Sequence, residues 1–298
     1  MGAVNNRTDV ALLAVALVWG SSYLAAQEVV EPDTVFAVLV LRFALAAGVL
    51  AALLTKRLRA VTREEVLLGV VFGAILSLIL TLETFGLTQT SAANAGLIIS
   101  LTIVVTPLLE RRRSLPGSFC LAALVAVGGV VVLSGGFVAP GGGDLLILLA
   151  AVARAGHLTV IARLSAGRSL DSARITLVQL LTALAVFVAL APLTGRGVGE
   201  VAADLDMRGW LLIGYLAFGC TVFAFLVQMW AVRRTSSSRV ALLLGTEPVW
   251  AAAIGVLVAG APVTAGGVVG AALILIGVNW ARALDGRRRA PTLTRWQT

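Results

Sequence analysis

Long apolar runs separated by short polar connections follow one another along almost the whole chain. A helix that crosses the hydrocarbon core of a bilayer needs about 20 predominantly apolar residues. Ten runs meet this requirement, approximately at Val10–Gln27, Val35–Leu54, Leu67–Phe85, Ala92–Leu109, Phe119–Gly136, Leu145–Leu164, Ile175–Leu193, Trp210–Trp230, Val240–Ala259 and Val263–Leu284. The pattern predicts an all-α integral membrane protein with ten transmembrane helices and no separate soluble domain.

The composition is that of a membrane protein. Hydrophobic residues make up 59% of the chain and charged residues 13%, whereas soluble domains have about 25% charged residues. Cys120 and Cys220 each stand alone in an apolar run, so neither a disulfide nor a metal-binding pair is expected. The sequence contains no GxxxxGK[ST] phosphate-binding loop, so this chain is not expected to pump with ATP.

The net charge of +8 is concentrated in alternate connections. Connections on the side of the N-terminus contain Arg7, Lys56, Arg57, Arg59, Arg63, Arg111, Arg112, Arg113, Arg163, Arg168, Arg174, Arg233, Arg234, Arg239, Arg282, Arg287, Arg288, Arg289 and Arg295. The opposite connections hold only Arg196 and Arg208. Because cytoplasmic loops are enriched in Lys and Arg, we expect both termini in the cytoplasm and the chain in a bacterial inner (cytoplasmic) membrane. The basic tail, residues 285–298, should face lipid headgroups rather than a nucleic acid.

An internal repeat relates the two halves of the chain. A shift of 145 positions superposes Glu83 on Gln228 and Thr102 on Glu247, and a shift of 135 superposes Asp9 on Asp144. The halves, residues 8–136 and 144–284, then hold five predicted spans each. An odd number of spans makes the second half enter the membrane from the other side, so we expect two inverted five-helix repeats.

Glu247-Pro248 interrupts the ninth run. A proline removes a helical N–H and leaves a carbonyl one turn earlier without its partner, and lipid cannot supply a substitute. A carboxylate at this depth needs the same shelter. We therefore expect a helix break at Pro248 that faces a polar interior. In the tenth run, Gly266, Gly270 and Gly277 share a face and predict close packing of the ninth and tenth helices.

Several of these features resemble the EamA family of the drug/metabolite transporter superfamily. They are Trp19-Gly20-Ser21-Ser22, Arg42-Phe43, Thr90-Ser91-Ala92 before the fourth run, and Glu247-Pro248 with the later glycines. The resemblance covers nearly the whole chain as two EamA-type halves. It implies a ten-helix secondary carrier with a central cavity between the halves, commonly an exporter of amino acids, metabolites or toxic compounds. The chain departs from the family pattern at Gly260-Ala261-Pro262 and around Arg154, so no particular substrate is implied.

Five ionisable side chains fall inside the predicted spans: Arg42, Glu83, Arg154, His157 and Glu247. A charge at the bilayer centre costs about 2.5–3.5 kcal/mol, so each should face the bundle interior or reach the membrane surface. A carboxylate held away from water could bind and release a proton, which makes Glu247 and Glu83 candidates for proton coupling. His157, the only histidine, is a third candidate, because a free imidazole titrates near about 6.5.

Each of these residues also has a structural interpretation. The carboxylates could form fixed ion pairs, His157 could be hydrogen-bonded into the bundle, and Arg42 could be a structural partner. Arg154 shares a helix face with His157 and could bind an anionic group of a solute or neutralise Glu83 or Glu247. With aromatic and amide side chains added, the residues expected to contact substrate are Trp19, Tyr23, Glu83, Asn94, Arg154, His157, Gln228, Glu247 and Trp250.

These patterns favour a secondary active transporter that exports small organic metabolites, amino acids or drug-like solutes by alternating access, in exchange for protons. Its expected partners are the solute, protons and membrane lipids, with no cofactor, metal or catalytic residue; a homodimer is one candidate assembly. The alternatives are an uncoupled facilitator, and a polytopic enzyme or membrane partner without transport. An enzyme is disfavoured because one histidine and no metal-ligand spacing leave little for acid–base or metal chemistry.

The predicted orientation can be tested with reporter fusions. A tag that is active only in the periplasm should be inactive when fused to the C-terminus, because the basic connections hold that end in the cytoplasm. The same tag inserted after Gly195, in a connection expected on the other side, is the positive control. Activity at the C-terminus would refute the orientation.

Overall fold

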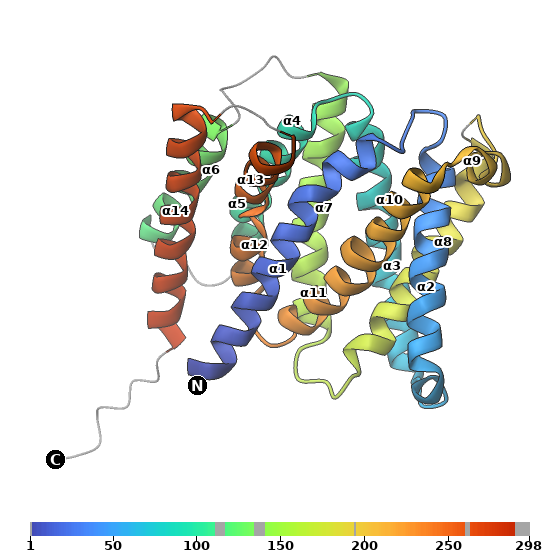
Figure 1. The fold of residues 1–298 in the computed structure, drawn as a ribbon. Coiled ribbons are helices and arrows are strands. Elements are labelled where there is room, and N and C mark those ends of the chain that lie inside the picture. Colours follow the sequence, from blue (N-terminus) through green and yellow to red (C-terminus); the bar gives the residue numbers. More distant parts are fainter. Residues whose placement is uncertain (1, 111–116, 134–140, 194, 260–262, 290–298) are drawn as a thin grey trace.

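The computed structural model describes residues 2–110, 117–133, 141–193, 195–259 and 263–289, and all regular secondary structure among them is helical (Figure 1). The helices are α1 (Gly2–Gln27), α2 (Val35–Leu58), α3 (Arg63–Leu87), α4 (Ala92–Ile99), α5 (Thr102–Leu109), α6 (Gly117–Leu133), α7 (Gly142–Leu164), α8 (Ser172–Leu190), α9 (Val198–Asp204), α10 (Met207–Ala217), α11 (Ala224–Val232), α12 (Ser237–Leu244), α13 (Glu247–Ala259) and α14 (Ala265–Arg289). A 3₁₀ turn, Ala191–Leu193, follows α8, and a π-helical segment, Phe218–Phe223, joins α10 to α11.

In the described part of the chain, six helical segments are long and apolar enough to cross a membrane. They are Arg7–Gln27, Val35–Leu58, Arg63–Leu87, Gly142–Leu164, Ser172–Leu193 and Met207–Val232. Gly117–Leu133 and Ala265–Ala281 are shorter apolar helices. This is the architecture of an all-α, multi-pass membrane protein.

Two of the predicted spans, the fourth and the ninth, are each divided into two short helices; a break was expected only in the ninth. The fourth run breaks between α4 and α5 at Ser100 and Leu101, so the prediction of a continuous helix there was wrong. The ninth run breaks between α12 and α13 at Gly245 and Thr246. Pro248 therefore lies in the first turn of α13, where its missing N–H removes no helical hydrogen bond.

The glycines of α14 face α6, so the predicted close packing exists but its expected partner, the ninth helix, was wrong. A Cβ atom added at Gly129 of α6 would lie 2.7 Å from the Gly270 carbonyl oxygen, and one at Gly277 would lie 2.6 Å from the Ala122 carbonyl oxygen. Gly129, near the end of α6, thus meets Gly270, near the start of α14. Ala122, near the start of α6, meets Gly277, which lies further along α14. The two helices run antiparallel.

Polar side chains cap the helix starts and tie them to neighbouring helices. Thr62 Oγ1 accepts from the Glu65 amide at 3.2 Å, and Glu65 Oε2 accepts from the Thr62 amide at 3.0 Å. This capping box satisfies two amide groups at the start of α3. The second oxygen of Glu65 accepts from the Asp171 amide at 2.8 Å, which fixes the start of α8 beside that of α3.

The basic connections lie at one end of the bundle. In Figure 1 the connections from α2 to α3, α7 to α8 and α11 to α12 lie at the same end as the N-terminus. They carry Arg59, Arg168 and Arg234 among other basic residues. Arg111–Arg113 and most of the expected tail, residues 285–298, lie outside the described residues, and α14 extends into the start of that tail as far as Arg289.

Adjacent glycines on α6 give a matched test of the packing with α14. Alanine at Gly129 would press a methyl group against the α14 backbone, 2.7 Å from the Ile274 amide nitrogen, whereas a Cβ at Gly128 has no atom within 4 Å. We expect Gly129→Ala to lower the free energy of unfolding by about 1–3 kcal/mol. Gly128→Ala should leave it unchanged or raise it slightly. Melting of the two purified variants in detergent measures the difference; equal melting temperatures would contradict the packing.

Candidate functional site

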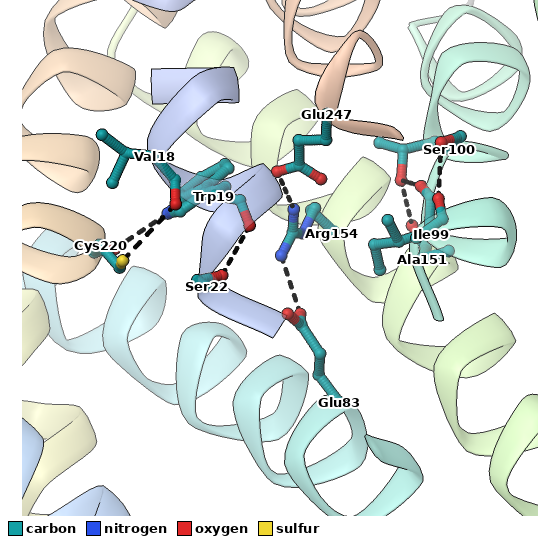
Figure 2. A network of polar contacts seen from close by, with 12 residues as sticks. Val18, Trp19, Ser22, Glu83, Ile99, Ser100, Ala151, Arg154, Cys220 and Glu247 are labelled. Carbon is teal, nitrogen blue, oxygen red and sulfur yellow. Dashed lines mark hydrogen bonds and ion pairs between the residues drawn. The ribbon is translucent and has the colours of Figure 1, made fainter. Parts of the chain in front are cut away.

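A buried arginine lies between two carboxylates at the centre of the bundle. Arg154 of α7 donates through Nη2 to Glu83 Oε2 of α3 at 2.8 Å and through Nη1 to Glu247 Oε1 of α13 at 3.4 Å. The side chains of Arg154, Glu83 and Glu247 are 12%, 13% and 4% exposed. Figure 2 shows the guanidinium placed between the two acids. We call these three residues the charged triad.

Trp19 of α1 packs against the triad and is held from two further directions. The Arg154 Cζ atom lies 4.8 Å from the centre of the indole ring, a cation–π arrangement. The indole Nε1 donates to the Cys220 carbonyl at 2.9 Å (Figure 2). The Phe225 ring lies 5.5 Å from the Trp19 ring. The only polar atom of the indole is therefore satisfied, and its face is left to Arg154.

The π-helical segment, Phe218–Phe223, provides the carbonyl that Trp19 uses. A π turn shifts the helical hydrogen bonds by one residue, and such turns are frequent at functional sites. Within it, Thr221 Oγ1 donates to the Leu216 carbonyl at 2.8 Å and accepts from Arg42 Nε at 2.8 Å. Arg42 is therefore placed as a structural partner of this segment.

Gly20 allows α1 and α13 to approach each other next to the triad. A Cβ atom at Gly20 would lie 2.7 Å from the Glu247 carbonyl oxygen and 3.0 Å from the Ala251 amide nitrogen. Both contacts are with backbone atoms, which cannot move aside as a side chain can. Trp19 thus contacts Arg154 through its side chain, and Gly20 next to it cannot carry a side chain without displacing α13.

Hydroxyl groups satisfy the backbone at both helix breaks. Thr102 Oγ1 donates to the Ile99 carbonyl at 2.6 Å, and Ser100 Oγ donates to the Gly96 carbonyl at 2.7 Å. At the second break, Thr246 Oγ1 donates to the Leu243 carbonyl at 2.7 Å. The Gly96 and Leu243 carbonyls also accept long backbone hydrogen bonds, both at 3.3 Å, so the hydroxyls complete the bonding of helix ends to which hydrocarbon offers no partner. The internal repeat related Thr102 to Glu247, but no sequence pattern indicated Ser100 or Thr246, because serine and threonine also occur in unbroken helices.

Two more of the predicted residues, Tyr23 and Trp250, lie beside the triad, and a third, Gln228, is buried on α11. Tyr23 is 4% exposed and lies within electrostatic range of Glu83, Glu247 and Arg154. Trp250 follows Glu247 by one turn of α13 and packs on Gly20. Gln228 is 2% exposed and follows Phe225 by one turn of α11. Among the described residues, Gln228 Oε1 and Trp250 Nε1 are buried without a hydrogen-bond partner.

Two further residues predicted to contact substrate, His157 and Asn94, are not among the observed contacts of the triad. His157 lies against Phe72 of α3, with ring centres 6.2 Å apart, and close to Gln179 of α8. It shares α7 with Arg154, but among the described residues no hydrogen bond or ion pair joins it to the triad. Asn94 is part of α4, but its side chain lies outside the described part of the chain.

The triad has the chemistry of an ion-binding or proton-binding site. With both acids ionised it carries two negative charges and one positive charge, and all three groups are shielded from water. Among the described residues, each carboxylate bonds to Arg154 through one of its two oxygens. Within the described residues, no group of three or more His, Cys, Asp and Glu side chains could hold a metal ion.

A charged site buried between membrane-crossing helices, next to broken helices, defines the class of membrane carriers. The model of the EamA-like transporter family matches residues 6–135 and again residues 141–281. The chain belongs to this family and consists of two EamA-type repeats, as the sequence indicated. It is therefore a membrane transporter rather than an enzyme.

Individual relatives agree with this assignment. An uncharacterized transporter of Archaeoglobus fulgidus is 28% identical over 280 residues, which cover 91% of this chain and 84% of the relative. A protein known by its crystal structure has the same fold, with a TM-score of 0.75 over 96% of this chain and 99% of that one, at 19% sequence identity.

Removing the central cation should destabilise the protein. Arg154→Gln leaves two buried carboxylates without their partner, and breaking a buried ion pair in this way costs about 3–5 kcal/mol. Adding Glu83→Gln to this variant should restore part of the loss, because one unpaired charge is removed. Melting temperatures of the purified variants measure both effects. Arg196→Gln is the control: it breaks the exposed contact with Asp204 and should change the melting temperature little. If Arg154→Gln and Arg196→Gln lowered the melting temperature equally, the stabilising role of Arg154 would be contradicted.

Proposed function

We propose that the protein is a secondary active transporter that exports small organic solutes across the inner membrane in exchange for protons. Its two five-helix repeats, inverted relative to each other, would alternate access to the charged triad. The observation that carries this proposal is the ion pair that crosses the repeats: Arg154 belongs to the second matched segment and Glu83 to the first. A site shared by two repeats changes when the repeats move against each other.

The inverted repeat is supported by helix boundaries. α4 begins and ends at residues 92 and 99, and α12 begins and ends at residues 237 and 244, a displacement of 145 at both ends. The same displacement relates Thr102, the first residue of α5, to Glu247, the first residue of α13. The antiparallel contact of α6 with α14 fits fifth and tenth spans that enter the membrane from opposite sides.

The centre of the site lies where the repeats meet. The shift of 135 positions that relates Asp9 to Asp144 also relates Trp19 to Arg154. These two residues are stacked on each other. Trp19 bonds to the second repeat at Cys220, and Arg154 bonds to the first repeat at Glu83. This reciprocal crossing supports a pseudo-twofold axis between Trp19 and Arg154.

Proton exchange is supported by the charges of the triad. One bound proton would make the triad electrically neutral, and its loss would leave a net negative charge in a buried site. Of the two acids, Glu83 makes the shorter contact with Arg154, 2.8 Å against 3.4 Å. We therefore assign Glu247 as the carboxylate that exchanges a proton and Glu83 as the main partner of Arg154. His157 is not part of this assignment, because it faces Phe72.

Buried polar atoms without partners support binding of a solute at the same place. Gln228 Oε1 can accept a hydrogen bond and Trp250 Nε1 can donate one. Leaving such a group buried and unpaired costs about 1–3 kcal/mol. A small organic molecule with both donors and acceptors, lying against Trp19 and Tyr23, would satisfy them.

Polar contacts of different strength join helices at the two ends of the bundle. At the end with the N-terminus, Arg239 donates to both carboxylate oxygens of Asp9, at 3.0 and 2.7 Å, and both side chains are buried. At the other end, the equivalent residue Asp144 accepts from the Thr90 hydroxyl at 2.5 Å. A bidentate charged pair is stronger than a single hydroxyl contact. Alternating access requires that the two ends of the bundle open in turn.

The proposal is tested by transport with and without the Glu247 proton site. Extracellular metabolites of cells that overproduce the wild type, compared with cells that overproduce Glu247→Gln, should identify a solute that accumulates outside only with the wild type. In vesicles with purified protein, a pH gradient should drive this solute through the wild type. Glu247→Gln should lose at least about nine-tenths of this driven flux, because glutamine cannot bind or release a proton.

Glu64→Gln is the matched control, because Glu64 is an exposed carboxylate that pairs with exposed Arg168. It should transport like the wild type. A Glu247→Gln variant that inserts and still shows full pH-driven flux would refute the assignment of the proton site. Saturable exchange of the solute that no pH gradient drives would identify an uncoupled facilitator instead.

A further inference from the structure

A basic pocket lies at the end of the bundle near the N-terminus, away from the charged triad. It has a volume of 670 Å³ and lies between the start of α8 and the end of α11. Its lining residues are Leu170, Asp171, Ser172, Ala173, Arg174, Leu226, Trp230, Arg233 and Arg234. We call it the basic pocket.

Two of its three arginines have no ion pair among the described residues. Arg233 donates to the Ser172 hydroxyl at 2.7 Å and to the Arg168 carbonyl at 3.2 Å, both uncharged, and its buried Nε has no hydrogen-bond partner. The Arg234 guanidinium lies 4.9 Å from the Trp230 ring centre. Arg174, in contrast, contacts Glu65 at 3.2 Å and Asp171 at 3.7 Å.

The acidic residue in the pocket does not cancel this charge. Asp171 Oδ1 caps α8 by accepting from the Ala173 amide at 2.8 Å. Its other oxygen lies 3.8 Å from Arg57 and 3.7 Å from Arg174. Asp171 is thus shared between a helix cap and two arginines, and the positive charges of Arg233 and Arg234 are left for a partner with negative charge.

The position of the pocket indicates what kind of anion reaches it. The membrane-crossing segment Ser172–Leu193 begins at the pocket, and the segment Met207–Val232 ends there. The pocket therefore lies at the level of lipid headgroups, where tryptophan is also enriched. Phe223, the last residue of the π-helical segment, is followed at helical spacing by Leu226 and Trp230 of α11, and Phe223 is 38% exposed. This apolar stripe leads from the pocket toward the hydrocarbon core.

We infer that the basic pocket binds an anionic phospholipid, with the phosphodiester group on Arg233 and Arg234 and an acyl chain along Phe223, Leu226 and Trp230. Guanidinium groups bind phosphate oxygens through paired hydrogen bonds. Basic pockets between transmembrane helices are suited to anionic headgroups. A free phosphate ion would use the same arginines but would gain nothing from the apolar stripe.

Lipid binding to the purified full-length protein tests this inference. Native mass spectrometry in detergent would compare dioleoylphosphatidylglycerol with dioleoylphosphatidylcholine, which share acyl chains and differ in headgroup charge. We expect tighter binding of the phosphatidylglycerol. In the double variant Arg233→Gln/Arg234→Gln its affinity should fall about tenfold or more, because two headgroup contacts are lost. Phosphatidylcholine binding should change less than about twofold.

The double variant Lys56→Gln/Arg59→Gln is the matched control. Both residues are exposed, lie at the end of α2 on the same side, and do not line the pocket. It removes the same number of charges and should bind phosphatidylglycerol like the wild type. Equal loss in both double variants would overturn the inference in favour of a diffuse charge effect. Equal binding of the two lipids by the wild type, or displacement of phosphatidylglycerol by millimolar inorganic phosphate, would also overturn it. The comparison of the two lipids and the displacement by phosphate use only wild-type protein, so they test the inference even if a variant does not fold.

Discussion

A guanidinium buried at membrane depth constrains much of this structure. Moving one ion out of water costs several kcal/mol, and the cost is offset only where counter-charges and hydrogen bonds surround it. Arg154 meets this requirement through Glu83 and Glu247, which lie on two different helices, and through the ring of Trp19 on a third. α1, α3, α7 and α13 are thereby held to a single point. The packing around that point follows, since Gly20 must remain bare for α13 to place Glu247 there.

The helix breaks belong to the same constraint. Glu247 is the first residue of α13, so its carboxylate lies at the end of a helix where the backbone dipole favours negative charge. The break thus stabilises the acid that faces Arg154. In the first repeat the equivalent residue is Thr102, which begins α5 and uses its hydroxyl for the Ile99 carbonyl. The two repeats share a broken backbone, but only the second places a charge on it.

Much of the fold and the core of the site could be predicted from the sequence. Apolar runs of spanning length locate the helices, and the cost of intramembrane charge singles out Glu83, Arg154 and Glu247 before any contact is known. The break at Ser100 could not be found, because no proline or glycine marks it and its polar groups are hydroxyls that also fit an unbroken helix. The π-helical segment depends on contacts with Trp19 and Arg42, which lie far away in sequence. The glycines of α14 predicted close packing, but a helix face does not identify its partner, so α6 was missed. His157 shares a face with Arg154, yet one turn along α7 is enough to place it against Phe72.

The two repeats differ in chemistry at equivalent positions. Glu83 corresponds to Gln228, Glu247 to Thr102 and Arg154 to Trp19, so each pair has one charged member. In the proposed alternating access the two halves would exchange conformations, but the charges would not become equivalent. During this movement Arg154 would either remain paired with both Glu83 and Glu247, or lose one of them and pair with another anion or with solvent. Because the free energy of a buried, unpaired charge is high, the second course requires that Glu247 take up a proton or that a solute replace it as the partner. In the proposed transport cycle, the asymmetry of these three residue pairs would link the movement of the two repeats to the state of a single site.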